Sequence, residues 1–195
     1  QLEALTEVSR PSRYLGGELG SICKAPGSVD LRIALAFPDV YEIGMSHIGF
    51  PILYHILNRL DWVAAERVYA PWPDMAEWLT QHDEPLCSLE SNLPLADFDI
   101  LGFTLQYELS YTNLLGMLEL SRLPLRSCER DNSHPLVVVG GPCAFNPEPL
   151  ADFFDCAVIG DGEEAIVELC QIVLEGKREE LSRAELLQRL SKVEG

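Results

Sequence analysis

Two short β-branched runs near the C-terminal end each stop abruptly at glycine, and this repeated ending constrains the fold most. Residues 137–139 precede Gly140-Gly141-Pro142, and residues 158–159 precede the glycine-rich stretch 160–164. Successive strands that end at glycine are typical of an open parallel α/β sheet, which binds ligands at the carboxyl ends of its strands. We therefore look for function in the loops that follow the strands.

The rest of the chain alternates between strand patterns and helix patterns. Apolar runs predict strands at 31–37, 66–70, 98–104, 135–139 and 155–159, with a short edge strand at 85–89. Apolar residues at helical spacing predict helices over 52–60, 73–81, 111–118, 161–176 and 182–190. Asp161 and Ser182 each stand three residues before a Glu, which indicates a capping box at the start of the last two helices.

This alternation implies right-handed βαβ crossovers. The predicted fold is α/β, a flavodoxin-like or Rossmann-like doubly wound and mainly parallel sheet of about five or six strands. We expect an irregular N-terminal extension over residues 1–29, the α/β domain over 30–176, and a C-terminal helix or linker over 177–195.

Composition narrows the classes of function. A net charge of −17 repels phosphate backbones, so we expect no nucleic acid to be bound by this chain. No run approaches ~18 apolar residues, and no positive segment followed by an apolar one opens the chain, so we expect a cytoplasmic protein without a membrane span. The six cysteines lie far apart, which excludes local zinc or iron–sulfur spacings and leaves no predicted metal ligand.

The loops after the strands hold the candidate ligand-binding residues. The first loop is long for a connection of this kind, and it carries neither a Gly-Lys-Ser/Thr sequence nor a G-x-G-x-x-G pattern, which disfavours a P-loop or a nicotinamide cofactor. The candidate residues are Tyr41, Glu42, Gly44, Ser46 and His47 in the first loop, Gln106, Tyr107 and Ser110 in the second, Gly140, Gly141 and Pro142 in the third, and Gly160, Gly162 and Glu163 in the fourth.

Each of these loops also has a purely structural interpretation. His47 fits a local hydrogen-bonding role, and Ser110 fits a helix cap. Gly140 and Gly141 fit a tight turn without a ligand, and Glu163 fits the positive end of a helix. No serine, cysteine or lysine has an evident base partner, so we predict no catalytic residue in this chain.

Taken together, the segments 37–49, 70–75, 102–113, 140–149 and 160–164 resemble the N-terminal portion of radical S-adenosylmethionine (SAM) proteins that carry a cobalamin-binding-like domain. The resemblance extends from about residue 10 to 176. It implies a flavodoxin-like domain placed before a radical SAM barrel. In such enzymes the barrel holds a [4Fe–4S] cluster through Cys-x3-Cys-x2-Cys, and this sequence lacks that loop. The resemblance thus implies that the cluster and SAM belong to a C-terminal part outside it.

The resemblance also implies where cobalamin enters. Its nucleotide tail would lie in the crevice between the first loop, the loop after the third strand and the Gly140-Gly141-Pro142 loop. Cobalamin domains that supply an axial histidine use Asp-x-His-x-x-Gly, whereas here Met45 replaces the aspartate and Gly49 follows His47 one position early. We therefore expect no cobalt ligation by His47.

Three functional hypotheses follow. The first is a cobalamin-binding-like domain that presents cobalamin to the barrel, or shapes its crevice, for a radical or methyl-transfer reaction on an unknown substrate. The second is a degenerate domain that binds no cofactor and docks a substrate or a protein partner, because its acidity suits a basic surface. The third is a small-nucleotide or flavin site in the same crevice.

Overall fold

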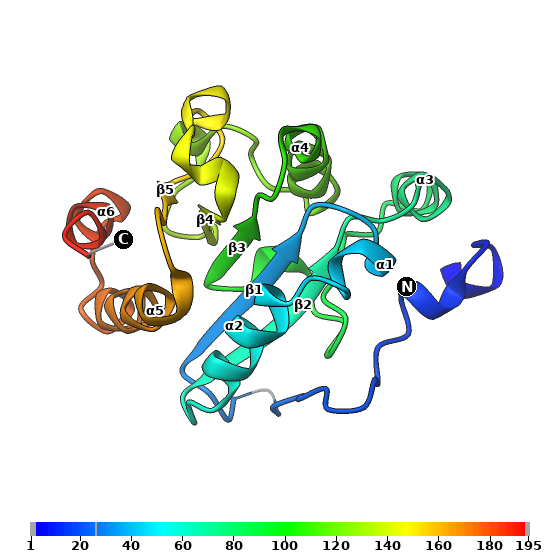
Figure 1. Ribbon diagram of the computed structural model, residues 1–195, viewed down its shortest axis with the longest axis horizontal. Helices are drawn as coiled ribbons and strands as arrows, with labels where there is room; N and C mark the ends of the chain where they lie inside the picture. The colour runs from blue at the N-terminus through cyan, green and yellow to red at the C-terminus, as the bar shows by residue number, and fades with distance from the viewer. Residues whose placement is uncertain (1–2, 26, 194–195) are drawn as a thin grey trace.

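The structure is a computed structural model that describes residues 3–25 and 27–193. Within these residues, five parallel strands form one sheet in the order β2-β1-β3-β4-β5 (Figure 1). The strands are β1 (Leu31–Phe37), β2 (Val63–Tyr69), β3 (Ile100–Thr104), β4 (Leu136–Gly140) and β5 (Cys156–Ala157). This order is that of flavodoxin-like folds, whose direction of winding changes between β1 and β3. The predicted fold class is confirmed.

Helices cover both faces of the sheet. They are α1 (Tyr41–Gly44), α2 (Gly49–Asn58), α3 (Pro73–Gln81), α4 (Tyr111–Leu120), α5 (Gly162–Arg178) and α6 (Arg183–Leu190). Buried side chains of α2, α5 and α6 pack on one face, and those of α3 and α4 pack on the other. Short 3-10 turns occur at Ala4–Thr6, Pro11–Arg13, Leu95–Asp97, Glu108–Ser110, Ser127–Glu129, Pro142–Phe145 and Glu148–Leu150.

The register of the central strands leaves a hollow on one face of the sheet. Leu35 of β1 pairs with Gly102 of β3, and Gly102 pairs with Val138 of β4. These three residues form one row on the face that α2 and α5 cover, because residues paired across parallel strands point to the same side. The middle member of the row has no side chain, so the sheet is hollowed there.

Several details predicted from the sequence are wrong. Residues 85–89 form no strand of the sheet; Cys87 makes an isolated antiparallel bridge to Pro94, because the chain turns back on itself within a few residues. Asp161 makes no side-chain capping bond at α5, whereas the predicted capping box from Ser182 to Glu185 is present at α6.

Gly176 does not end α5, which continues to Arg178. A Cβ atom at position 176 would lie 2.9 Å from the Cδ1 atom of Leu186. This glycine therefore allows α6 to approach α5 closely, and its role is packing rather than helix termination.

Both terminal segments pack on the α/β core. In the N-terminal extension, Ala4 and Val8 are buried, and the amide of Ser9 donates to Asp74 at 2.9 Å. At the other end, Leu190 of α6 is buried among residues of the α2–α5 face. The helices in the described part of the chain are all too short or too polar to cross a bilayer.

Candidate functional site

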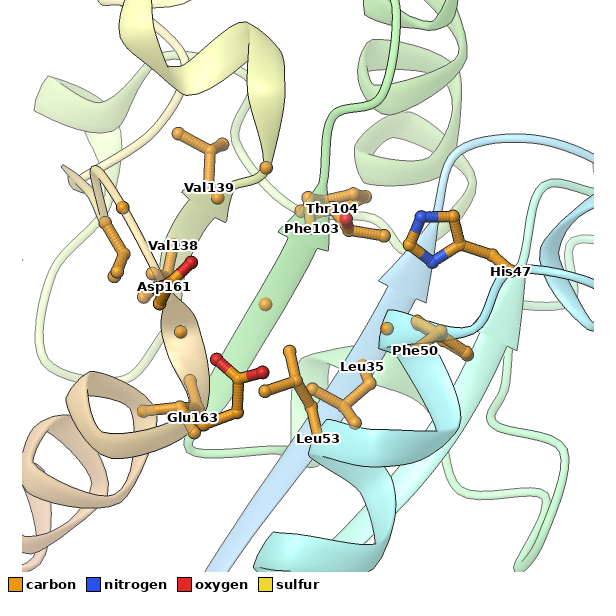
Figure 2. Close-up of a pocket in the computed structure, with 18 residues that line it drawn as sticks. Leu35, His47, Phe50, Leu53, Phe103, Thr104, Val138, Val139, Asp161 and Glu163 are labelled. Atoms are coloured by element: carbon orange, nitrogen blue, oxygen red, sulfur yellow. The ribbon is translucent and has the colours of Figure 1, made fainter.

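A cavity of about 210 Å³ opens at the carboxyl ends of the strands, between α2 and α5 (Figure 2). It therefore lies where flavodoxin-like sheets bind their ligands. Its lining comprises Leu35, His47, Gly49, Phe50, Leu53, Gly102, Phe103, Thr104, Val138, Val139, Gly140, Gly141, Val158, Gly160, Asp161, Gly162, Glu163 and Ile166.

The floor of the cavity is the hollow over Gly102. A Cβ atom at this position would meet the Cδ atoms of Ile33 and Leu35 at 3.7 Å, which is ordinary van der Waals contact. The sheet itself would therefore tolerate a larger residue at Gly102, but the side chain would project into the cavity. A glycine inside a strand commonly marks a place where a ligand or another backbone approaches closely.

Glycines also form much of the wall, so the cavity is bordered by exposed backbone. Gly140 and Gly141 end β4, and Gly160 and Gly162 lead from β5 into α5. Gly141 has φ +92° and Gly160 has φ +120°, a region that other residues rarely adopt. Gly141 thus adopts a backbone conformation that favours glycine, and the chain here brings its backbone to the cavity.

His47 stands at the β1 side of the cavity, above Phe50 in Figure 2. Its ring packs against Phe37 with centroids 5.6 Å apart, and its Cε1 atom lies close to Gly49. The Nδ1 atom is buried and has no hydrogen-bond partner among the described residues. A buried polar atom without a partner is costly, so a turn of the ring that brings this nitrogen to a bound ligand would be stabilising.

The charged groups at the cavity are acidic. Asp161, the residue before α5, and Glu163, in the first turn of α5, lie on the side opposite His47 (Figure 2). No lysine or arginine is among the lining residues of the described chain. Most other lining side chains are apolar, so the site suits an uncharged planar group better than a free phosphate. The described residues contain no group of three or more His, Cys, Asp or Glu placed to hold a metal ion.

The predicted site residues divide into two groups. Those that line the cavity are His47, Gly140, Gly141, Gly160, Gly162 and Glu163. Those that do not line it are Tyr41, Glu42, Gly44, Ser46, Gln106, Tyr107, Ser110 and Pro142. The second group supports the loops around the site.

In the first loop, polar side chains tie α1 to the N-terminal extension. The hydroxyl of Tyr41 donates to Glu18, and burial, followed by this bond, raises the pKa of Tyr41 to about 12. Glu42 accepts from Arg10 and Arg13 at 2.9 Å each. A backbone hydrogen bond within Glu42, followed by those from Arg13 and Arg10, holds its pKa below the ordinary value.

The other two residues of this loop also have local roles. A Cβ atom at Gly44 would stand 2.5 Å from the ring of Tyr69, so this glycine is required for packing. Ser46 donates to the carbonyl of Glu42 at 2.9 Å and closes the end of α1.

The loop after β3 is anchored to the end of its own strand and to the loop after β1. Gln106 donates through Nε2 to the hydroxyl of Thr104 at 2.6 Å, and Tyr107 donates to Asp39 in the first loop. Ser110 is buried and donates to the carbonyl of Tyr107 at 2.7 Å; it makes no side-chain cap. Pro142 begins the 3-10 turn after Gly141.

Sequence reasoning missed the floor and the helix-facing wall of the site. Gly102 carried a detectable signal, because a glycine interrupts the apolar run 98–104. Phe50 and Leu53 of α2 and Ile166 of α5 carried none, because apolar residues at helical spacing also indicate ordinary core.

Comparisons with known proteins show the family to which the chain belongs. A family model described as "Radical SAM proteins, N-terminal" matches residues 49–195. An uncharacterized protein of Methanocaldococcus jannaschii is 33% identical over 139 residues, which are 71% of this chain and 26% of that protein. The chain thus spans about a quarter of the length of this relative. Because the family model covers well over half of the sequence, the chain belongs to the family of radical SAM N-terminal domains.

Proposed function

We propose that this domain holds a planar-ring cofactor, cobalamin in the first instance, beside the catalytic part of a radical SAM enzyme. The observation that carries the proposal is the glycine-floored cavity at the point where the winding of the sheet changes. Apolar walls and exposed backbone suit a flat ring that must approach the sheet closely.

The size of the cavity indicates which part of cobalamin it takes. About 210 Å³ is below the roughly 300–1,000 Å³ of pockets for drug-sized ligands. It would therefore receive the ring of the nucleotide tail rather than the corrin. Gly102 would lie under that ring, Gly141 beside it, and the Nδ1 atom of His47 would offer a hydrogen bond.

When bound, cobalamin would supply the methyl-transfer or radical chemistry of the full enzyme. The residues of this chain would bind the tail, orient it and exclude water from the crevice. We assign the [4Fe–4S] cluster, SAM and the radical SAM barrel to the rest of a longer protein. The length of the relative supports this assignment, because this chain covers about a quarter of it. We infer no catalytic residue and no metal ligand within this chain.

Titration with hydroxocobalamin tests the proposal. Gly102→Leu would fill the cavity from its floor, whereas Gly116→Leu places the same side chain on α4, where a Cβ atom has no neighbour within 4 Å. Equilibrium dialysis and absorbance should show stoichiometric binding to the wild type and to the Gly116→Leu variant. The Gly102→Leu variant should bind at least about tenfold more weakly, a loss of about 1.4 kcal/mol.

Other outcomes identify the alternatives. If neither the chain nor the full-length protein binds hydroxocobalamin, the cofactor proposal fails and the docking hypothesis takes its place. A yellow protein whose flavin is lost in the Gly102→Leu variant would assign the same cavity to a flavin.

A further inference from the structure

Large apolar side chains are exposed at the carboxyl-end loop of every strand. We call this set the strand-end face: Ile43, Met45 and Ile48 after β1, Trp72 after β2, Leu109 after β3, Phe145 after β4 and Ile159 after β5. Leu109 is 86% exposed, Ile48 is 78% exposed and Phe145 is 68% exposed. Apolar residues that gather around one site mark an interaction surface, whereas scattered ones need no explanation.

In residues 3–25 and 27–193, the opposite edge of the sheet lacks this feature. Among the described residues, the remaining large apolar side chains that are exposed are Leu15 and Leu19 of the N-terminal extension and Ile52 of α2. The loops that lead into the strands instead carry ion pairs, such as Lys177 with Asp99 and Arg178 with Asp30. The asymmetry indicates that one edge of the sheet faces a partner.

The negative charge of the strand-end loops indicates which chemistry the surface of that partner should have. Residues 38–49, 70–75, 105–113, 141–154 and 159–164 contain nine Asp or Glu and no Lys or Arg. Within the described ranges, no basic side chain forms an ion pair with Glu108, Glu148, Asp161, Glu163 or Glu164. A complementary surface would be apolar and would carry lysine or arginine at its rim.

We propose that the strand-end face is the docking surface for the catalytic part of the full-length polypeptide, which meets it through an apolar surface rimmed by basic residues. This inference rests on the proposed function for the identity of the partner. The family match to an N-terminal domain and the much greater length of the relative support a partner in the same chain. Docking here would close the mouth of the cavity and place its ligand between the two parts.

Hydroxyl-radical footprinting of the full-length protein without cobalamin tests this inference separately from cofactor binding. Met45, Trp72 and Phe145 should oxidise as slowly as the buried Met117, Trp78 and Phe50, whereas Leu19 of the extension should oxidise at the rate of an exposed leucine. Protection of the strand-end face without cobalamin binding would support the docking while the cofactor proposal fails.

A charge-reversal variant tests the nature of the partner. Glu108→Lys with Glu148→Lys in the full-length protein should raise the oxidation of Leu109 and Phe145 several-fold. Glu77→Lys, on the exposed face of α3, should leave both rates unchanged. Oxidation of Met45, Trp72 and Phe145 at fully exposed rates in the wild type would overturn the inference. Protection that disappears on dilution would also overturn it, because it would assign the face to a second copy.

Discussion

Gly141 lies directly against the backbone of Leu105, and this contact builds the wall of the cavity between β3 and β4. A Cβ atom at position 141 would stand 2.9 Å from the carbonyl oxygen of Leu105. The amide of Leu105 donates to the carbonyl of Gly140 at 2.7 Å, and the amide of Cys143 donates to the carbonyl of Leu105 at 3.0 Å. A residue without a side chain is therefore needed for the two loops to remain joined.

Gly141→Ala should destabilise the domain by about 2–4 kcal/mol, because it adds a backbone clash to an unfavourable positive φ. Gly17→Ala is the matched control, since its φ is +71° and nothing lies within 4 Å of its Cβ position. The control should lose only about 1 kcal/mol, from φ alone. Urea unfolding measures both variants. Equal losses would mean that the contact with Leu105 does not constrain residue 141.

Arg183 should be essential for holding α6 on the domain. Its guanidinium contacts the carboxylate of Asp155 at 2.7 Å, and the side chain of Asp155 is only 2% exposed. Arg183→Ala should cost about 2–4 kcal/mol, somewhat less than for a sole partner, because Arg130 still contacts Asp155. Arg189→Ala, which removes an exposed pair with Glu179, should cost clearly less than Arg183→Ala. Thermal and urea unfolding measure both losses, and similar losses would contradict the role of Arg183 in holding α6.

Asp131 should show a depressed pKa that depends on Ser133. Hydrogen bonds from the hydroxyl and then the amide of Ser133, followed by His134, lower the pKa of Asp131 from 3.8 to about 2. A depressed folded-state pKa means that this contribution to stability is present above pH 3.8 and is lost as the pH falls toward 2. Carboxyl NMR titration should place the midpoint near 2, and Ser133→Ala should raise it more than His134→Gln does. A reversed order would contradict the ranking of these contacts.

Most of the fold was predictable because its signals are local. Leu31–Phe37 matches its predicted range because a proline directly follows this apolar run. Pro73–Gln81 matches because a proline marks the first turn of the helix. β5 was predicted longer than it is, because Val158 and Ile159 are apolar although the register with β4 ends at Ala157. Pairing at the edge of a sheet depends on neighbours that a local pattern does not contain.

The site was only partly predictable, for a related reason. Glycine pairs at strand ends indicated Gly140, Gly141, Gly160 and Gly162, because such residues are needed where backbone turns sharply. The floor at Gly102 depends on strand register, which brings it between Leu35 and Val138. Polar residues of the first loop were attractive candidates, yet Tyr41 and Glu42 are engaged by the N-terminal extension, whose position the sequence does not reveal.

His47 should strengthen cobalamin binding without being a cobalt ligand. Its Nδ1 atom is buried without a partner in the described residues, so a ligand toward which the ring turns would gain a hydrogen bond of about 1 kcal/mol, or roughly fivefold in affinity. His47→Ala should therefore weaken hydroxocobalamin binding by about this factor and leave the absorption spectrum of the bound form unchanged. His55→Ala, on the exposed side of α2, is the matched control and should change neither. A wild-type spectrum with histidine ligation that disappears in His47→Ala would contradict the prediction, and it would mean that the shortened motif around Met45 and Gly49 still reaches the cobalt.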